Sequence, residues 1–142
     1  MATPSPTPSN AQTQFSQTVI ATDRDQNDCP VGSNTTFNAT EPLIYVFTRI
    51  DYLPAGSLIS ARWSVDGVLY FDDMQCWVPN QTYNDICAYC TVSPEGGAFQ
   101  TGAWSVEMLL DGQVMTQAQF QIVGDPQSQQ ALPTDVGATT GQ

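Results

Sequence analysis

Apolar and polar residues alternate along most of this chain, and no segment has the three-to-four-residue spacing of an amphipathic helix. Segments rich in β-branched and aromatic residues are separated by Gly, Pro and Asp, which favour turns. In the first such segment Phe15, Val19 and Ala21 are predicted to share one face. The segment 42–52 is apolar on both faces, which predicts a central position in its sheet. The predicted strands are residues 15–21, 42–52, 57–65, 68–71, 103–110 and 113–123, with a short further strand within 35–38.

The dipeptide Asp66-Gly67 predicts a tight hairpin, because both central positions of a two-residue turn need a positive φ. This turn would pair Val65 with Val68 and Trp63 with Tyr70. Both apolar pairs would then lie on the same face of the sheet, which makes the register self-consistent.

The dipeptide Asp111-Gly112 predicts a second hairpin, but a plain two-residue loop would pair Leu109 with Val114 and Met108 with Met115. That register would place the apolar stripes of the two arms on opposite faces, since one residue of slip reverses every side chain. We therefore expect a three-residue loop or a bulge at Gly112.

Four cysteines form an even set in a small chain, which predicts two disulfides in an oxidising compartment. A zinc site is the alternative, but only Cys87 and Cys90 form a close pair, and histidine is absent. Residues 72–99 hold three of the four cysteines and are predicted to form a long loop tied by disulfides. We expect Cys76 to pair with Cys87 or Cys90, and Cys29 to take the other.

The two ends of the chain differ in composition from its middle. Residues 1–14 and 124–142 consist mainly of polar residues, Pro and Gly, and such segments bury too little apolar surface to offset the entropy of ordering them. They are predicted to be disordered linkers on either side of one domain, residues 15–123. A Pro/Thr/Ser-rich start is typical of the spacer after a removed targeting segment, so membrane attachment is expected only through a removed N-terminal anchor.

Charge and missing residue types narrow the range of functions. The formal net charge is −11, which repels phosphate backbones and anionic lipid surfaces, so no nucleic-acid partner is expected. The chain has neither histidine nor lysine, and therefore no histidine general base and no Schiff-base lysine. Asp72 and Asp73 make a poor glycosidase pair, because neighbours on a strand point to opposite faces. We expect no enzymatic activity.

Residues 43–123 resemble the immunoglobulin-like domains of bacterial cell-surface lipoproteins. The resemblance rests on Leu53-Pro-Ala-Gly56 before Ala61-Arg-Trp63, on Val65-Asp-Gly-Val68, and on Gly102-Ala-Trp-Ser-Val106 before Leu110-Asp-Gly112 and Phe120-Gln-Ile-Val123. It implies an all-β, immunoglobulin-like antiparallel sandwich of about seven strands at an extracytoplasmic location.

The chain departs from that pattern at two points. Neither 42–52 nor 103–110 contains a cysteine, so the disulfide of antibody-type domains is not expected. Trp104 stands where a tyrosine is usual, and an indole offers only an N–H donor. The hydrogen bond of the tyrosine corner therefore cannot simply be transferred to this chain.

Aromatic residues in the predicted loop are the first candidate site. Trp77, Tyr83 and Tyr89 could anchor a protein partner or stack on sugar rings. The alternative is that the loop folds back and buries them as a small core of its own. We expect a non-enzymatic structural or protein-interaction module of the cell envelope, or an accessory subunit of a surface complex, and we keep a carbohydrate-binding module as the alternative.

Oxygen-bearing side chains suggest two further kinds of site. Asp23, Asp25, Asn27 and Asp28 place oxygen ligands at nearby positions, which suits Ca²⁺, while an Asx-rich turn is the alternative reading. The loop is not an EF-hand, because its sixth position lacks the required glycine. No other cofactor is expected. Sequons for N-glycosylation occur at Asn34, Asn38 and Asn80.

Overall fold

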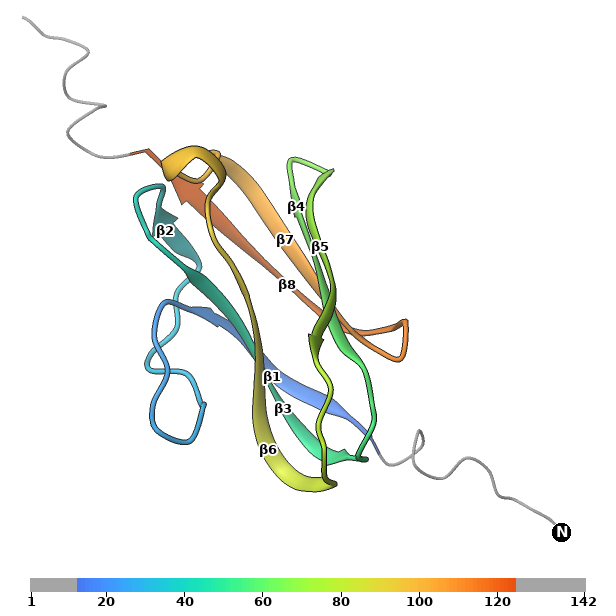
Figure 1. Ribbon diagram of the computed structural model, residues 1–142. Coiled ribbons are helices and arrows are strands. Elements are labelled where there is room, and N and C mark those ends of the chain that lie inside the picture. The colour runs from blue at the N-terminus through green and yellow to red at the C-terminus, as the bar shows by residue number, and fades with distance from the viewer. Residues whose placement is uncertain (1–12, 125–142) are drawn as a thin grey trace, which may run out of the picture.

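The computed structural model describes residues 13–124, which form a two-layered β-sandwich (Figure 1). One sheet has the strand order β1-β3-β6 and the other β2-β8-β7-β4-β5, and all neighbouring strands are antiparallel except β2 and β8. The predicted immunoglobulin-like sandwich is confirmed, with eight strands in the described residues. These are β1 (Phe15–Ala21), β2 (Thr36–Asn38), β3 (Ile44–Leu53), β4 (Ile59–Val65), β5 (Val68–Trp77), β6 (Tyr83–Val92), β7 (Gly102–Leu110) and β8 (Gln113–Val123).

The core lies between the two sheets and includes both tryptophans of the β4 and β7 strands. Trp63 and Trp104 are 0% and 1% exposed, as the alternating pattern predicted. Each large apolar side chain removed from water contributes about 1.5–3 kcal/mol. The same core cluster includes Ile44, Val46, Ile50, Leu53, Ile59, Val106, Met108, Phe120 and Ile122.

Trp104 also makes a corner hydrogen bond. Its Nε1 donates to the main-chain oxygen of Gln100 at 2.8 Å. In immunoglobulin-like domains a tyrosine near the start of the corresponding strand bonds to the backbone a few residues upstream. The bond could not be transferred from the sequence alone, but the indole N–H of Trp104 reaches the same kind of acceptor.

A bulge in β1 corrects the prediction for its faces. Gln17 has a φ of 52°, and the pairing with β3 shifts by one residue there. Phe15 therefore packs on the core side with Ile20, whereas Val19 and Ala21 lie opposite the outer side of β3. The prediction that Phe15, Val19 and Ala21 share one face is wrong, since the extra residue reverses the alternation.

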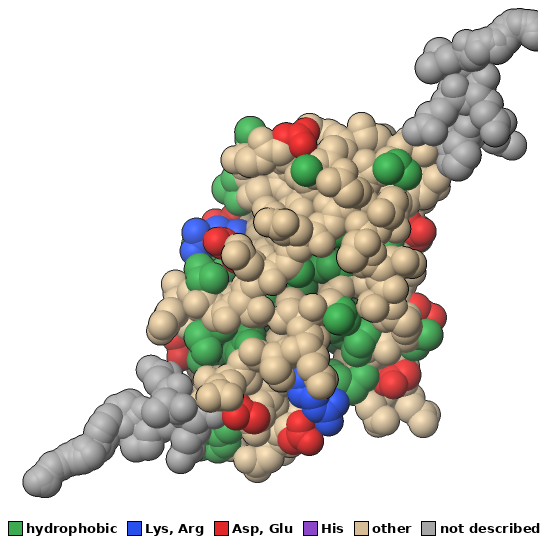
Figure 2. All heavy atoms as spheres, turned by 180° about the vertical axis from the view of Figure 1, so that it is seen from behind, with side chains coloured by type: hydrophobic (Ala, Val, Ile, Leu, Met, Phe, Trp, Pro, Cys, Tyr) green, Lys and Arg blue, Asp and Glu red, His purple; other side chains and the backbone are tan. Residues whose placement is uncertain are grey.

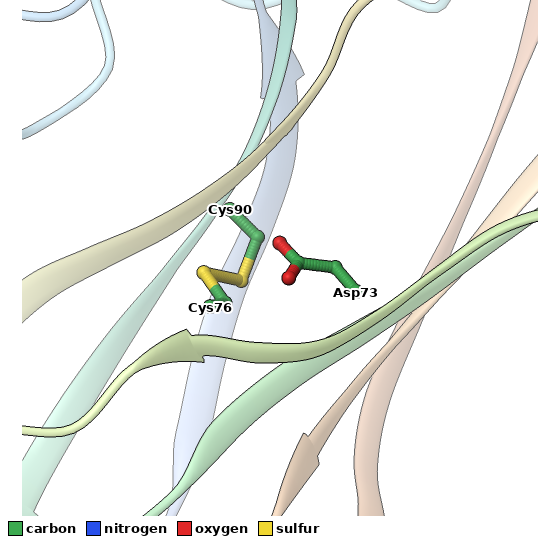
Figure 3. A group of neighbouring side chains, drawn as sticks. All are labelled: Asp73, Cys76 and Cys90. Carbon is green, nitrogen blue, oxygen red and sulfur yellow. A yellow bond between two sulfur atoms is a disulfide. The ribbon is translucent and has the colours of Figure 1, made fainter.

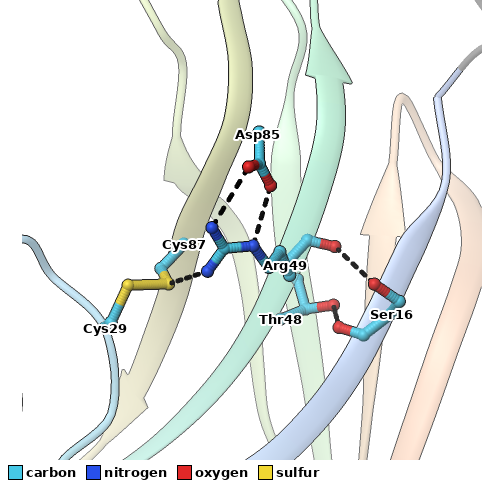
Figure 4. Close-up of polar contacts among 6 residues, drawn as sticks. All are labelled: Ser16, Cys29, Thr48, Arg49, Asp85 and Cys87. Carbon is cyan, nitrogen blue, oxygen red and sulfur yellow. Dashed lines mark hydrogen bonds and ion pairs between the residues drawn. A yellow bond between two sulfur atoms is a disulfide. The ribbon is translucent and has the colours of Figure 1, made fainter.

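Polar contacts hold the bulge against β3 (Figure 4). Thr48 is 1% exposed, and its Oγ1 donates to the main-chain oxygen of Ser16 at 3.0 Å. The hydroxyl of Ser16 donates in turn to the main-chain oxygen of Arg49 at 3.5 Å. The buried hydroxyl of Thr48 therefore finds its hydrogen-bond acceptor in β1, next to the bulge.

The first hairpin keeps its predicted turn but not its full register. Val65 pairs with Val68 across Asp66-Gly67, as predicted. Trp63, however, pairs with Phe71 and not with Tyr70. A bulge leaves Tyr70 as the extra residue and turns its ring onto the core.

The second hairpin contains the expected irregularity at a different residue. The turn has two residues, Asp111 with φ 51° and Gly112 with φ 86°. Leu109 pairs with Val114 and Met108 with Thr116, so Met115 is the extra residue of a bulge. The predicted three-residue loop or Gly112 bulge is therefore wrong in place, although the bulge at Met115 brings the apolar stripes to the same face.

Both turn aspartates also bind the main chain at or just before the start of another strand. Asp111 bonds Leu58 through its main-chain N–H at 2.8 Å and its Oδ1 at 2.9 Å. Asp66 binds Ala103 in the same way, at 2.7 Å and 2.9 Å. Gly102 has a φ of 145°, and a Cβ there would lie 2.6 Å from Asp66 Oδ2, so this close approach requires glycine.

The domain begins before the predicted boundary at residue 15. Thr13 is 3% exposed, and Gln14 donates its main-chain N–H to Asp51 Oδ1 at 2.7 Å. These two residues belong to the sandwich and not to a linker. The rest of the predicted linkers, apart from Gly124, lies outside the described residues. Within the described range no helix is long and apolar enough to cross a membrane.

The predicted long loop at residues 72–99 is wrong. β5 continues to Trp77, and β6 occupies Tyr83–Val92, so most of this segment is sheet. The alternation was hidden because β5 carries Asp72 and Asp73 and is exposed along much of its length. The disulfides that were expected to tie a loop therefore join strands.

Candidate functional site at the β5–β6 edge

Two disulfides involve the strands of the β5–β6 edge. They are Cys76–Cys90 and Cys29–Cys87, which is one of the two pairings left open by the sequence. Cys76 lies in β5 and Cys90 in β6, so this bond joins the edge strands of the two sheets. The chain therefore has an inter-sheet disulfide, but this bond joins β5 and β6. The antibody-type bond would instead join β3 and β7.

The second disulfide fixes the loop that follows β1 over the outer face of the smaller sheet. There it lies beside a cluster of aromatic rings around Phe47, which is 1% exposed although it faces away from the main core. Tyr45 stacks on Phe47 with ring centroids 5.3 Å apart, and Tyr89 meets Tyr45 edge-on at the same distance. Tyr89 therefore belongs to this outer cluster.

Every arginine of the chain is paired with a carboxylate. The pairs are Arg24–Asp28, Arg49–Asp85 and Arg62–Glu107. Figure 2 shows the same arrangement on one face, where blue spheres lie beside red ones. The strongest geometry is the fork of Arg49 on Asp85, with Nε–Oδ1 at 2.7 Å and Nη2–Oδ2 at 3.2 Å (Figure 4). These hydrogen bonds lower the pKa of Asp85.

A cavity of about 270 Å³ lies along β6, in contact with cysteines of both disulfides. β6 pairs only with β3 among the described strands, so its other edge carries main-chain groups that no strand pairs. The wall combines aromatic rings, sulfur and carboxylates. It is formed by Asp28, Asp73, Cys76, Trp77, Cys87, Ala88, Tyr89, Cys90 and Thr91.

Asp73 is the distinctive charged residue of this cavity. Figure 3 shows its carboxyl group directed toward the Cys76–Cys90 disulfide, and an oxygen and both sulfurs lie within 4.8 Å of one another. Burial raises the pKa of Asp73, the charge of Asp72 adds to the rise, and the main-chain N–H of Gln75 opposes it. The group is not a metal site in the oxidised chain, because disulfide sulfurs are not thiolates.

The structure brings together two of the three predicted binding aromatics. Trp77 and Tyr89 line the same cavity. Tyr83 is not part of the wall and packs on Trp77, with ring centroids 5.6 Å apart. All three rings are partly buried. They form a cavity wall and its support, and not the exposed platform on a loop that the sequence suggested.

The carboxylates of the predicted calcium loop have other partners. Asp25 Oδ1 accepts hydrogen bonds from the N–H groups of Asn27 and Cys29, at 2.8 Å and 3.1 Å. Asp28 pairs with Arg24, and Asp23 accepts from the main chain of Arg24. This is the Asx-turn alternative. Calcium binding stays a prediction that the described geometry does not favour.

The three sequons differ in accessibility. Asn34 and Asn80 are exposed and lie in connections between strands. Asn38 ends β2 and is partly buried, and its side-chain oxygen accepts from the hydroxyl of Thr40 at 2.7 Å. Asn34 and Asn80 are therefore accessible, and Asn38 is less so. Modification of each stays a prediction.

β5 exposes an apolar surface that the sequence analysis did not single out. Val68, Leu69, Phe71 and Met74 are 67%, 55%, 41% and 72% exposed. We call these four residues the β5 apolar edge. β5 is an edge strand of its sheet and pairs only with β4 among the described strands.

One signal in the sequence could have revealed this surface. Between the turn at Asp66-Gly67 and Cys76, bulky apolar residues occupy both odd and even positions. A strand that is buried on one face needs them at alternate positions only. Asp73 offered no comparable signal, since its burial depends on a disulfide to a strand that was not predicted.

Comparisons with known proteins add no family. No protein family and no curated protein matches the chain. Among solved structures, the DNA glycosylase AlkC of Pseudomonas fluorescens, bound to DNA with an abasic site analogue, has 8% identity and a TM-score of 0.49. The alignment covers 78% of this chain, which spans about a third of the glycosylase (30%).

A second similar structure is a CARDB domain from Pyrococcus furiosus, solved in complex with di-metal ions. It has 12% identity and a TM-score of 0.37, and the alignment covers 78% of this chain and 94% of that domain. Likenesses this distant carry no argument about function. The class that the fold itself defines is an immunoglobulin-like β-sandwich module with two disulfides.

Proposed function

We propose that this chain is a non-enzymatic, extracytoplasmic protein-interaction module that binds a partner protein along the β5 apolar edge. The observation that carries the proposal is the concentration of exposed apolar side chains on one strand. Of the eight large apolar residues exposed in residues 13–124, four lie on β5. Exposed apolar residues scattered singly are normal, whereas four on one edge strand favour an interaction surface.

The position of β5 supports the same proposal. An edge strand offers unpaired N–H and C=O groups to an added strand, and alternate side chains can then give specificity. β2, at the other end of this sheet, has only three residues. β5 has ten, and it contains no proline, one of the residues that commonly protect an edge.

The disulfides are compatible with an extracytoplasmic location, where such bonds form and persist. We extend the proposal to a surface-anchored module of the cell envelope, or an accessory subunit of a surface complex, that is attached through an N-terminal lipid anchor. Support for the anchor comes from the Pro/Thr/Ser-rich composition of the first residues. Palmitate labelling of the full gene product in its own cells tests this part, and an absence of label would contradict it.

The docking surface is tested by charge substitution on β5. Leu69→Lys and Met74→Lys place a solvated ammonium on the surface that a partner would bury. Chemical cross-linking in envelope preparations of the source organism should give a discrete adduct with the unmodified chain. Either substitution should reduce that adduct at least about tenfold, which corresponds to about 1.4 kcal/mol of binding free energy.

Val114→Lys is the matched control. Val114 is 44% exposed and lies beside the β7–β8 turn, so the substitution adds the same charge on another part of the surface. The proposal predicts an unchanged adduct with this variant. Equal yields from all three variants would show that β5 is not the binding edge.

Carbohydrate binding is the second candidate, and one observation favours it. Trp77 and Tyr89 line a common cavity with Asp73, and aromatic rings beside carboxylates can hold a sugar. A glycan array with the unmodified chain and Trp77→Ala tests this function. Binding of any glycan that Trp77→Ala abolishes would establish it, and no binding would remove it.

A further inference from the structure

We infer that the cavity between the two disulfides is a receptor for an arginine side chain of the partner protein, with Asp73 as the counter-ion of its guanidinium. This inference rests on the proposed function, because the arginine would belong to the partner that docks on β5. Asp73, Cys76 and Trp77 are all residues of β5, so the cavity adjoins the proposed docking edge.

The first argument is charge. Asp73 lies partly buried against a disulfide, in surroundings that stabilise an anion poorly. The three arginines are the chain's only basic side chains, and they are paired with Asp28, Asp85 and Glu107. The fold thus has no cationic side chain left for Asp73. A cation that completes this site has to come from another molecule.

The second argument is the chemistry of the wall. Trp77 supplies an aromatic ring in the same cavity wall as Asp73. Tyr89 lines the cavity too, but Arg24 already lies over its ring. A guanidinium group is planar and weakly hydrated, stacks on aromatic faces and binds carboxylates through parallel N–H bonds. The fold already shows this combination once, since Arg24 lies over the ring of Tyr89 at 5.3 Å while it pairs with Asp28.

The third argument is size. The cavity measures about 270 Å³, which is below the roughly 300–1,000 Å³ of pockets for drug-sized ligands. It therefore suits one inserted side chain. The unpaired edge of β6 adds main-chain oxygens, which suit a group that carries five N–H donors.

NMR with the oxidised, ¹⁵N-labelled full chain tests the inference, with N-acetyl-arginine amide as the probe at low ionic strength. The indole N–H of Trp77 and the amides of Ala88 and Tyr89 should shift in a saturable manner. N-acetyl-citrulline amide has the same shape without the charge, and it should produce no saturable shift. Equal binding of both probes would overturn the inference.

Asp73→Asn and Asp72→Asn form the matched pair of variants. Both remove one negative charge from adjacent residues of β5, but only Asp73 is part of the cavity wall. Asp73→Asn should raise the dissociation constant of the arginine probe at least tenfold, and Asp72→Asn less than twofold. Equal effects would show general attraction to an acidic protein and would overturn the site. Circular dichroism checks that both variants fold.

Further outcomes separate this inference from the two proposed functions. A methyl glycoside that shifts the same signals regardless of Asp73→Asn would identify a sugar site and overturn the arginine receptor. If no arginine binding occurs while the adduct still depends on Leu69 and Met74, the receptor fails and the docking edge stands. If arginine binds through Asp73 while no adduct depends on Leu69 or Met74, the docking edge fails and a cation site remains.

Discussion

Trp63 and Trp104 are both buried in the core, yet their indole N–H groups have different surroundings. Trp104 Nε1 donates to the main-chain oxygen of Gln100. Trp63 Nε1 is buried and has no hydrogen-bond partner among the described residues. An unsatisfied buried donor costs about 1–3 kcal/mol, whereas a made hydrogen bond contributes about 0.5–1.5 kcal/mol. The indole N–H therefore stabilises the fold at Trp104 and destabilises it at Trp63.

Substitution of each tryptophan by phenylalanine should reveal this difference. Both changes remove a similar part of a buried ring and so share the loss of packing. Trp104→Phe also loses a hydrogen bond, and Trp63→Phe removes an unsatisfied donor. We expect Trp104→Phe to lower the free energy of unfolding by about 2 kcal/mol more than Trp63→Phe does. Urea unfolding followed by far-UV circular dichroism measures both, and the reverse order would contradict the assignment.

Asp73 should weaken the fold once it ionises. A carboxyl whose pKa is raised in the folded state holds its proton more tightly there than in the unfolded chain. Relative to the ionised form, the protonated carboxyl stabilises the folded state. This contribution is complete below the unfolded pKa and is lost as the pH rises through the folded pKa. Asp73→Asn should therefore raise the free energy of unfolding at pH 7, by about 0.5 kcal/mol because solvent screens a partly exposed group.

The same substitution should have little effect at pH 3, where the carboxyl of Asp73 is largely protonated in the folded state. Asp72→Asn is the control for the removal of one charge. Urea titrations at the two pH values measure the effect. A gain from Asp73→Asn that is equal at both pH values would argue against desolvation as its cause.

At the scale of elements, bulges explain where prediction from the sequence succeeded and where it failed. The alternation predicted β1 and β8 to the residue, and the two Asp-Gly dipeptides predicted both turns. The bulges at Gln17, Tyr70 and Met115 leave no local signature, because their positions depend on which strands pair. Only for the third irregularity was there a warning, since the two apolar stripes would otherwise conflict, but the sequence placed it at the turn and not at Met115.

The candidate site was less predictable than the strands. Trp77 and Tyr89 could be named as spare aromatics, but their meeting in one cavity depends on the Cys76–Cys90 bond between two sheets. β6 was missed because its sequence, from Tyr83 to Val92, holds two cysteines in a segment that resembled a tied loop. Contacts between strands distant in sequence therefore had to come from the structure.

Deletions in β8 test the role of its bulge. Without Met115, Thr116 would follow Val114 directly and could keep its pairing with Met108, so ΔMet115 should fold with a loss of about 1–2 kcal/mol for the partly buried side chain. ΔGln119 should be far more damaging. To keep Phe120 in the core, it would force the polar Gln117 inward.

Thermal unfolding of the two deletion variants compares them directly. We expect ΔMet115 to unfold cooperatively, and ΔGln119 to be largely unfolded at 25 °C. Similar melting temperatures for both would contradict the register assigned to the β7–β8 pair. They would show that β8 tolerates a reversal of its faces.

At the scale of the whole molecule, the two edges of the sandwich have different properties. On one side β1 lies near β8, and hydroxyl groups connect the two sheets, with Thr18 Oγ1 within 2.9 Å of Thr116 Oγ1. On the other side β5 and β6 are joined by a disulfide and adjoin the cavity of Asp73 and the exposed β5 apolar edge. The cavity and the exposed apolar residues are thus concentrated at the β5–β6 edge of the sandwich.

Site-specific photo-cross-linking tests the central proposal, a docking surface on β5, most directly. A photoreactive phenylalanine analogue would replace Met74, which is 72% exposed on β5, or Val114, which is 44% exposed near the β7–β8 turn. Irradiation of the source cells should give one discrete protein adduct from position 74 and none from position 114. Absence of an adduct at position 74, or the same adducts from both positions, would contradict the account.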